Sequence, residues 1–274
     1  IEAKGIQSVK VIDSKPIGAN VRSTVATYDG VFDDLRKLFA RTADAKAKGL
    51  TAGDFSYNTG KLRCPVCDGT GIITMDVQFL PDVDTICPSC GGSRYGKDAY
   101  DILWKSKEKD SVSVSLPGLL KLTVEEAAGI LHEETKIAKQ LKILQDLGVC
   151  YLTLGEATPA LSGGEAQRLK LAYEMETPQQ GSVFVFDEPT IGLHPQDVKK
   201  LVLIFDHLIQ LGATVIVIEH DLELVTNCDY IIDMGPWGGT EGGRVVVEGT
   251  PEAVAATSES ITGRYLKQEL AEDK

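Results

Sequence analysis

Residues 161–195 read "LSGGEAQRLKLAYEMETPQQGSVFVFDEPTIGLHP", a glycine-containing turn, a helix and then an apolar strand that ends in two carboxylates. In open α/β sheets, ligands bind at the carboxyl ends of the strands. Neighbouring side chains on a strand point to opposite faces, so Asp187 and Glu188 should have different roles. Asp187 is placed to hold Mg²⁺ through its water shell, and Glu188 to orient or deprotonate an attacking water. The alternative is that these two carboxylates belong to an ordinary surface turn at the end of a strand. Without further motifs, this alternative would be favoured.

Two further features lie in order around this strand. Ser162, Gly163 and Gly164 open a helix, so main-chain amides and the positive end of the helix dipole can face an anion. After an apolar run at 213–218, His220 is placed where an imidazole can reach a γ-phosphate. Each feature is common, but the ordered set is not, and it indicates a nucleoside triphosphate site.

The stretch lies in a region where helices and strands alternate. Buried apolar strands separated by helices indicate a mostly parallel sheet with crossover helices. The expected elements are helix 162–175, strand 182–187, helix 195–211, strand 213–219, a short helix after Asp221, and strands 230–234 and 244–249. Residues 8–13 also alternate like a strand. We therefore assign residues 1–13 and 161–274 to an α/β core and residues 14–160 to an inserted subdomain.

Two helix signals stand out within the insert. Residues 31–49 place apolar side chains on one helical face, with Gly49 as a C-cap. Thr123 is an expected N-cap, and Glu126 stands at the capping-box offset. The insert is thus predicted to be helical outside a turn-rich region at 50–110.

A nucleotide site of this kind also needs a phosphate-binding loop, Gly-x-x-x-x-Gly-Lys-Ser/Thr. The Gly-Lys pairs are Gly60-Lys61 and Gly96-Lys97, and neither is followed by the Ser or Thr that the pattern requires. The glycine-rich run "GPWGGTEGG", 235–243, lacks the lysine and is interpreted as a connection between two strands. The sequence therefore contains no such loop, and we expect this chain to be part of a longer protein.

Four of the six cysteines form two pairs with the spacing Cys64-x2-Cys67-x19-Cys87-x2-Cys90. This spacing is typical of a four-thiolate zinc site, and a closed tetrahedral site has a structural role. Redox-active thiols are the alternative. We predict one structural zinc ion per chain in knuckles that span residues 64–90. Lone Cys150 and Cys228 are interpreted as small buried apolar residues, and a reducing cytoplasm is favoured over a secreted location.

The charge pattern limits the function classes. The formal net charge of −12 argues against a protein that binds nucleic acid through its overall field. Residues 1–110 carry 16 Lys/Arg and 15 Asp/Glu, a balance of +1, so this part is the least repulsive to a phosphate backbone. No apolar run approaches the roughly 18 residues of a transmembrane helix, and the first residues do not form a signal peptide.

These motifs resemble those of ATP-binding-cassette (ABC) proteins. "LSGGEAQR" resembles the signature, "FVFDEPT" the Walker B strand with the catalytic glutamate, and "IEHD" the switch histidine. "TIGLHPQDV" is similar to the D-loop of one branch, the UvrA family of the bacterial excinuclease. The resemblance implies that Ser162, Gly163 and Gly164 contact the γ-phosphate and that Glu165 and Gln167 also belong to the nucleotide-binding residues. It makes Asp187 the Mg²⁺ carboxylate, Glu188 the water-activating base and His220 the γ-phosphate sensor.

The family resemblance has a consequence for activity. Cassette proteins hold ATP between the phosphate loop of one cassette and the signature of another. The resemblance therefore implies that this chain is the C-terminal part of a second cassette, and that by itself it does not turn over ATP. Catalytic phosphate release that Glu188→Gln abolishes would contradict this expectation.

The cysteine region extends the resemblance. "FSYNTGKLRCPVCDGTG", "VQFLPDVDTICPSCGGSRY" and "LTVEEAAGIL" resemble the zinc-bearing insert of the second UvrA cassette, and the likeness runs from about residue 11 to about residue 256. "CPVCDGTG" is also similar to the knuckle of DnaJ-type co-chaperones, but those proteins carry four knuckles and no cassette motifs. The resemblance to UvrA accounts for both parts of the chain.

Membership of the UvrA family would imply a dimeric ATPase of nucleotide excision repair and the SOS response, in the bacterial cytoplasm and without a membrane partner. Its partners would be lesion-bearing double-stranded DNA and a UvrB-like protein, and its cofactors Zn²⁺, ATP and Mg²⁺. Lesions share no base pattern, so recognition should read DNA shape through backbone contacts. The candidate DNA contacts lie in the insert: Arg22, Ser23, Lys61, Arg63, Arg94 and Tyr95.

Three departures from the family pattern support an alternative. Ser14 stands where the family has glutamine, Ala19 where it has arginine, and residues 68–86 contain four Asp and no Lys or Arg. These changes favour a divergent paralogue, such as the UvrA-like proteins linked to drug self-protection. The alternative function is an ABC-type zinc scaffold that binds protein partners and little DNA. A transporter cassette is a third class, against which the zinc insert argues.

Overall fold

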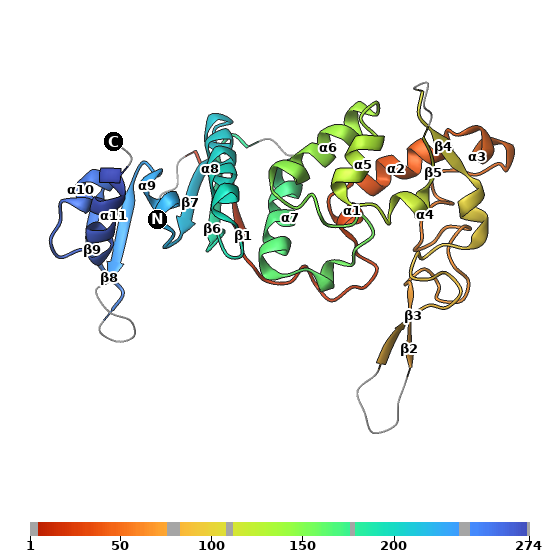
Figure 1. Ribbon diagram of the computed structural model, residues 1–274, viewed down its shortest axis with the longest axis horizontal. Coiled ribbons are helices and arrows are strands. Elements are labelled where there is room, and N and C mark those ends of the chain that lie inside the picture. Colours follow the sequence, from red (N-terminus) through yellow and green to blue (C-terminus); the bar gives the residue numbers. More distant parts are fainter. Residues whose placement is uncertain (1–4, 76–82, 108–111, 176–178, 236–241, 273–274) are drawn as a thin grey trace. The chain divides into compact units, whose positions relative to one another are not determined.

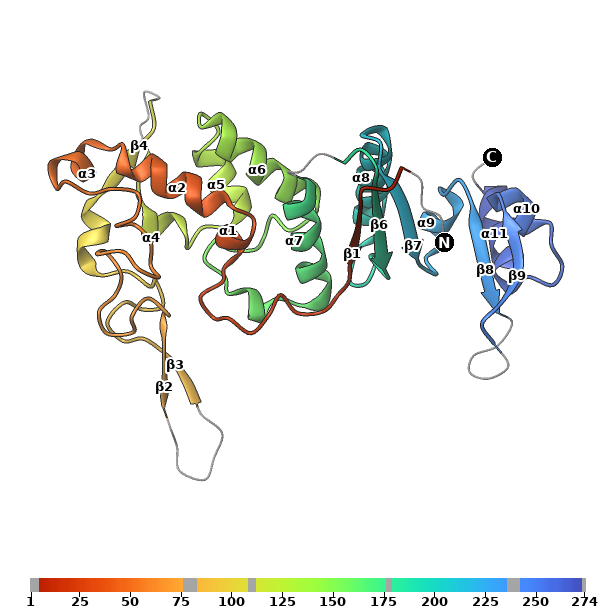
Figure 2. The same cartoon turned by 180° about the vertical axis from the view of Figure 1, so that it is seen from behind.

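A computed structural model describes residues 5–75, 83–107, 112–175, 179–235 and 242–272 (Figures 1 and 2). The chain divides into two compact units. The sheet unit comprises Ile1–Asp13 and Gln179–Lys274, and the insert unit comprises Ser14–Pro178. The first boundary coincides with the end of the predicted strand 8–13, while the second falls 18 residues later than the expected boundary at 160/161.

The sheet unit is built on three parallel strands in the order β1-β6-β7, namely Ser8–Ile12, Ser182–Asp187 and Thr214–Ile218. The register pairs Ile12 with Phe186, and Asp187 with Ile218. Helix α8, Pro195–Gln210, packs against one face of the sheet, and the Phe186 and Phe205 ring centroids lie 4.6 Å apart. The predicted parallel α/β arrangement is confirmed.

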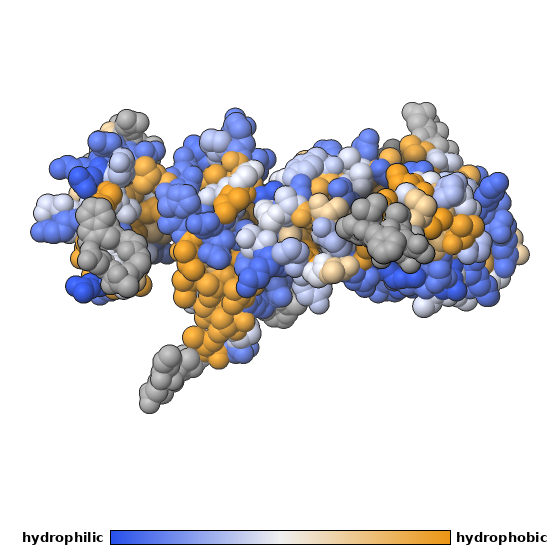
Figure 3. All heavy atoms as spheres, turned by 90° about the horizontal axis from the view of Figure 1, so that it is seen from below, coloured by the Kyte–Doolittle hydropathy of each residue, from blue (hydrophilic) through white to orange (hydrophobic). Residues whose placement is uncertain are grey.

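The opposite face of this sheet is apolar and exposed. Val9 and Val11 on β1 are each 61% exposed, and Ile216 and Ile218 on β7 are 50% and 56% exposed. Figure 3 shows apolar surface gathered over this part of the sheet unit. Parallel sheets in α/β proteins are covered on both faces, so this face is where further structure is expected to pack.

The remainder of the sheet unit forms a small cluster of its own. Its elements are α9 Leu222–Thr226, β8 Ile231–Gly235, β9 Arg244–Gly249, α10 Pro251–Ala255 and α11 Ile261–Glu272. Strands β8 and β9 pair antiparallel, apart from the parallel sheet, and their core is Val225, Ile231, Val254 and Leu266. Of the connection expected at 235–243, residues 236–241 lie outside the described part of the chain.

The insert unit combines short helices with small antiparallel ladders. Its helices are α1 Val25–Tyr28, α2 Val31–Ala40, α3 Ala43–Ala47, α4 Leu116–Leu119, α5 Val124–Ile130, α6 Thr135–Asp146 and α7 Gly163–Met175, with 3-10 turns Lys97–Asp101 and Thr158–Ala160. Its ladders are β2–β3, Ile72–Met75 with Val83–Ile86, and β4–β5, Leu103–Lys105 with Ser113–Ser115.

Two details of the insert unit qualify the sequence predictions. The helix expected at 31–49 is broken after Ala40, because the Thr42 hydroxyl donates to Phe39 O at 2.8 Å and then caps α3. Helix α7 belongs to the insert unit because it packs on α6 and α1, with the Tyr28 and Tyr173 ring centroids 5.6 Å apart. Within the described ranges, each helix is too short or too polar to cross a lipid bilayer.

Candidate nucleotide and zinc sites

Strand β6 delivers two carboxylates to the rim of the parallel sheet. Asp187 is its last residue, and Glu188 follows with a positive φ of 46°. The Glu188 N–H donates to Ile218 O at 2.9 Å, which joins the turn to the end of β7. A left-handed conformation is uncommon outside glycine, and it turns the chain sharply away from the strand direction.

His220 follows the end of β7 and lies next to Glu188. Its Nδ1 is 3.9 Å from Glu188 Oε1. The side chains of His220 and Glu188 are 80% and 46% exposed, so both face solvent. The structure thus brings together three residues that the sequence predicted at this rim, since Asp187 is registered with the last residue of β7.

The Glu219 side chain holds the main chain of this rim in place through hydrogen bonds, a role that the sequence did not predict. Its side chain is 2% exposed, and it accepts hydrogen bonds from Thr190 N at 3.0 Å, the Thr190 hydroxyl, His220 N at 2.6 Å and Asp221 N at 3.1 Å. Burial alone would raise the pKa of Glu219, but these hydrogen bonds outweigh burial and hold the pKa below its usual value. The sequence signal for this role is a carboxylate that directly follows the apolar run 213–218.

The signature residues occupy the start of α7 in the insert unit. Glu165 closes a capping box: Ser162 N donates to Glu165 Oε2 at 2.7 Å, and Glu165 N to Ser162 Oγ at 3.4 Å. Tyr151 donates to the other Glu165 oxygen at 2.8 Å. Burial would raise the pKa of Glu165, but the bonds from Ser162 and Tyr151 lower it.

The remaining signature residues differ in accessibility. Ser162 is exposed, whereas Gly164 and Gln167 are buried, with Gln167 only 3% exposed. A Cβ at Gly163 would lie 3.0 Å from Ser14 O, so Ser14 lies against the start of α7. The surface available to a ligand at this helix start is Ser162 with the adjoining main chain.

The four predicted cysteines form one cluster. Their sulfur atoms all lie within 4.8 Å of one another, with Cys64–Cys87 at 4.0 Å and Cys67–Cys90 at 3.7 Å. A tetrahedral zinc ion with Zn–S bonds of about 2.3 Å requires sulfur–sulfur separations of about 3.8 Å, whereas a disulfide would require about 2.0 Å. Cys64 and Cys87 are fully buried. The cluster fits a structural four-thiolate zinc ion.

Hydrogen bonds around the cluster favour thiolate at one position. Burial would raise the pKa of Cys64, but main-chain N–H groups of Cys67 and Val66 and the neighbouring thiols outweigh burial and bring its pKa to about 7. Burial and the neighbouring sulfurs instead raise the pKa of Cys90 to about 12. Zinc binds the thiolate form and releases the remaining protons on binding.

The candidate DNA contacts fall into two groups. Arg22, Lys61 and Arg63 are partly or largely exposed, with side-chain exposures of 29%, 77% and 38%, and Ser23 is half-buried beside them in sequence. Arg94 and Tyr95 are 7% and 1% exposed. The four exposed or half-buried residues are accessible to a ligand such as DNA, whereas the buried Arg94 and Tyr95 are not.

Arg94 and Tyr95 instead hold the insert unit together. Arg94 Nη1 donates to Val21 O at 2.9 Å, and its guanidinium lies 5.2 Å from the Tyr57 ring centroid. The Tyr95 hydroxyl donates to Phe55 O at 2.6 Å. Burial lowers the pKa of Arg94 and raises that of Tyr95. Sequence alone placed them beside a knuckle but did not show that they point inward.

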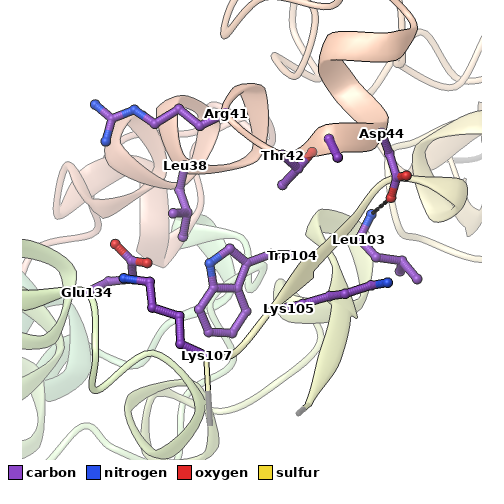
Figure 4. A pocket seen from close by; sticks show the side chains of 10 residues that line it. Leu38, Arg41, Thr42, Asp44, Leu103, Trp104, Lys105, Lys107 and Glu134 are labelled. Carbon is purple, nitrogen blue, oxygen red and sulfur yellow. Dashed lines mark hydrogen bonds between the residues drawn. The ribbon is translucent and has the colours of Figure 1, made fainter.

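A pocket of about 490 Å³ lies elsewhere in the insert unit (Figure 4). Trp104 and Leu38 form its apolar wall, and Lys107 and Glu134 lie at its edge. Asp44 on its far side accepts a hydrogen bond from Leu103 N at 3.2 Å. None of the predicted site residues lines this pocket.

The parallel sheet with its helices, and with Asp187, Glu188 and His220 at its rim, has the α/β fold of the ABC-type ATPase class. No protein-family model matches the chain. It is 45% identical to UvrABC system protein A of Staphylococcus aureus strain COL over 96% of the chain, and 44% identical to that of Bacillus subtilis strain 168 over 100%. The chain spans 27% and 28% of these relatives' lengths, so it corresponds to about a quarter of them.

A solved structure is similar in both sequence and fold. The crystal structure of UvrA2 from Deinococcus radiodurans superposes with a TM-score of 0.86 at 42% identity, over 96% of this chain and 32% of that one. Over the matched stretch, this chain belongs to the UvrA family. These matches do not favour the alternative of a protein-binding scaffold.

Proposed function

We propose that this chain is the C-terminal part of the second cassette of a UvrA-type ATPase that recognises DNA damage in nucleotide excision repair. The observation that carries the proposal is the combination, in one chain, of a cassette rim at Asp187, Glu188 and His220 with a four-cysteine insert. Either part alone occurs in other protein classes. The relatives named UvrABC system protein A support the same assignment.

The proposed nucleotide chemistry belongs to the rim of the sheet. Asp187 would hold Mg²⁺ through its water shell, Glu188 would orient and deprotonate the attacking water, and His220 would donate to a γ-phosphate oxygen. The buried Glu219 would keep the turn that carries His220 in place through its bonds to the main chain. When bound, Mg²⁺ would neutralise part of the negative charge of the phosphates.

The proposed site is composite. Ser162, Gly163, Gly164, Glu165 and Gln167 would serve the nucleotide held by another cassette, with Ser162 and the adjoining main chain as the contact and Glu165 as its cap. The phosphate loop would come from a part of the protein outside this sequence. We propose that this part also covers the exposed face formed by Val9, Val11, Ile216 and Ile218.

We expect the 274-residue chain by itself to bind and hydrolyse ATP too weakly for turnover, because it has no phosphate loop. Release of inorganic phosphate from Mg·ATP should equal that of a Glu188→Gln variant. Release that exceeds that of the variant reproducibly would contradict the composite site.

The zinc-bearing insert is the proposed DNA-binding part. Arg22, Ser23, Lys61 and Arg63 would contact the phosphate backbone, and lesions would be recognised through the shape and deformability of the duplex. The zinc ion would have a purely structural role. In the whole protein we propose a homodimer, recruitment of a UvrB-like partner and a location in the bacterial cytoplasm.

Binding of fluorescently labelled damaged duplex, measured by anisotropy across a salt series, tests this proposal. Affinity should fall steeply with salt, and Arg63→Gln should reduce the slope of log K against log salt by about one. Lys199→Gln on α8 of the sheet unit removes the same charge and should leave the slope unchanged. Salt-independent binding, or equal effects of both variants, would favour the protein-binding scaffold.

A further inference from the structure

Asp68 lies between two of the arginines that are proposed to face DNA. It directly follows the zinc-site residue Cys67 and has a positive φ of 50°. Asp68 Oδ2 is 3.3 Å from Arg22 Nη2, and Asp68 Oδ1 is 3.1 Å from Arg63 Nη1. Each oxygen of one carboxylate is therefore paired with a different guanidinium group.

The two arginines are also held by main-chain acceptors. Arg22 Nη1 donates to the Asp68 carbonyl oxygen at 2.8 Å, and Arg63 Nη1 donates to Asn58 O at 3.0 Å. These bonds do not involve the Asp68 carboxylate. Its removal should therefore leave both arginines close to their present positions. The carboxylate itself is 59% exposed, so it faces the same solvent as the guanidinium groups.

We infer that Asp68 is an internal competitor for phosphate, which weakens the binding of backbone phosphates to Arg22 and Arg63. The guanidinium fork pairs with carboxylate and phosphate in the same way, so a phosphate that approaches either arginine has to displace or share the Asp68 carboxylate. The negative charge also repels the approaching backbone. This inference rests on the proposed function, because it requires that this surface meets DNA.

The consequence is a restraint on non-specific binding. Contacts to phosphate supply essentially all of the affinity for undistorted duplex. A carboxylate that is paired with two arginines lowers that affinity. Only a duplex that comes close enough to displace the carboxylate can form phosphate contacts with both arginines. Asp68 thus sets how tightly the zinc insert holds ordinary DNA.

Anisotropy titration of an undamaged duplex with the 274-residue chain tests the inference. Asp68→Asn should bind about three- to tenfold more tightly at low salt, with a salt slope steeper by about one, since two exposed ion pairs no longer compete. Asparagine tolerates the positive φ, and Asp68→Gly serves as a second variant that takes this conformation freely. Zinc content should be unchanged in both.

Asp84→Asn is the matched control. Asp84 is exposed on β3 of the same insert and accepts a hydrogen bond from the Thr74 hydroxyl at 2.6 Å, so the variant removes the same charge away from the arginines. It should change the affinity by less than about twofold. In the Arg22→Gln/Arg63→Gln background, where only the general repulsion remains, Asp68→Asn should change the affinity by less than about twofold, as Asp84→Asn does.

The outcomes separate the two proposals. If the unmodified chain binds duplex and Asp68→Asn binds no more tightly, or Asp84→Asn tightens binding equally, the inference is wrong and the proposed DNA surface stands. If neither the unmodified chain nor either Asp68 variant binds duplex, the DNA surface and the inference both fail.

Discussion

At the residue scale, the buried Glu219 carboxylate supports the main chain around the proposed catalytic residues Glu188 and His220. Replacing it with glutamine leaves one acceptor oxygen for donors from Thr190, His220 and Asp221, and directs an amide N–H₂ towards main-chain N–H groups. An unsatisfied buried donor costs about 1–3 kcal/mol. We expect Glu219→Gln to lower the free energy of unfolding by about this amount at neutral pH, measured by urea titration.

The same residue makes the stability of the sheet unit depend on pH. The folded-state pKa of Glu219 is lowered, so its contribution is complete above the unfolded value of about 4.3 and is lost as pH falls through the folded value. The acid-side loss of stability should therefore be smaller in Glu219→Gln than in the unmodified chain. Parallel pH profiles for the two proteins would show that Glu219 does not contribute in this way.

At the scale of elements, the first knuckle contains a turn that has room for glycine alone, whereas the second knuckle does not. A Cβ at Gly69, with φ of 80°, would lie 1.7 Å from Tyr57 O, whereas a Cβ at Gly91, with φ of 57°, would meet nothing within 4 Å. Both alanine variants carry the left-handed cost of about 1–2 kcal/mol. Gly69→Ala should lose more than about 3 kcal/mol and release zinc readily to a colorimetric chelator, because the clash displaces the first knuckle. Equal stability and zinc retention in the two variants would contradict this role.

The elements also show what the sequence could predict. The sequence predicts the strands at 182–187 and 213–219 because unbroken apolar runs signal buried parallel strands. It predicts the Thr123 capping box because that is a local pattern. The break after Ala40 was not found, because it depends on a hydroxyl that turns back to bond the preceding helix.

At the candidate sites, too, the sequence predicts features that are local and does not predict contacts between distant segments. Spacing alone located the cysteines and the rim, since both follow from local chemistry. It could not show that Arg94 and Tyr95 point inward, or that Asp68 pairs with Arg22, because these contacts join segments far apart in sequence. The role of Glu219 was missed for a related reason, since its donors come from two separate loops.

At the scale of the whole molecule, the two units differ in what they need from the rest of the protein. The sheet unit has an exposed apolar face, and in the proposed function its nucleotide chemistry needs a phosphate loop from another part of the protein. The insert unit carries its own core and a cysteine cluster whose four sulfurs all come from within it. Zinc binding by the insert unit can therefore be tested on this chain by itself.

Zinc-edge X-ray absorption on the purified 274-residue chain tests the central claim, that the four cysteines hold one structural zinc ion. We expect one zinc per chain, four sulfur neighbours at about 2.3 Å and no nitrogen or oxygen neighbour. A chain that folds without zinc, or a metal with water or imidazole among its ligands, would contradict it.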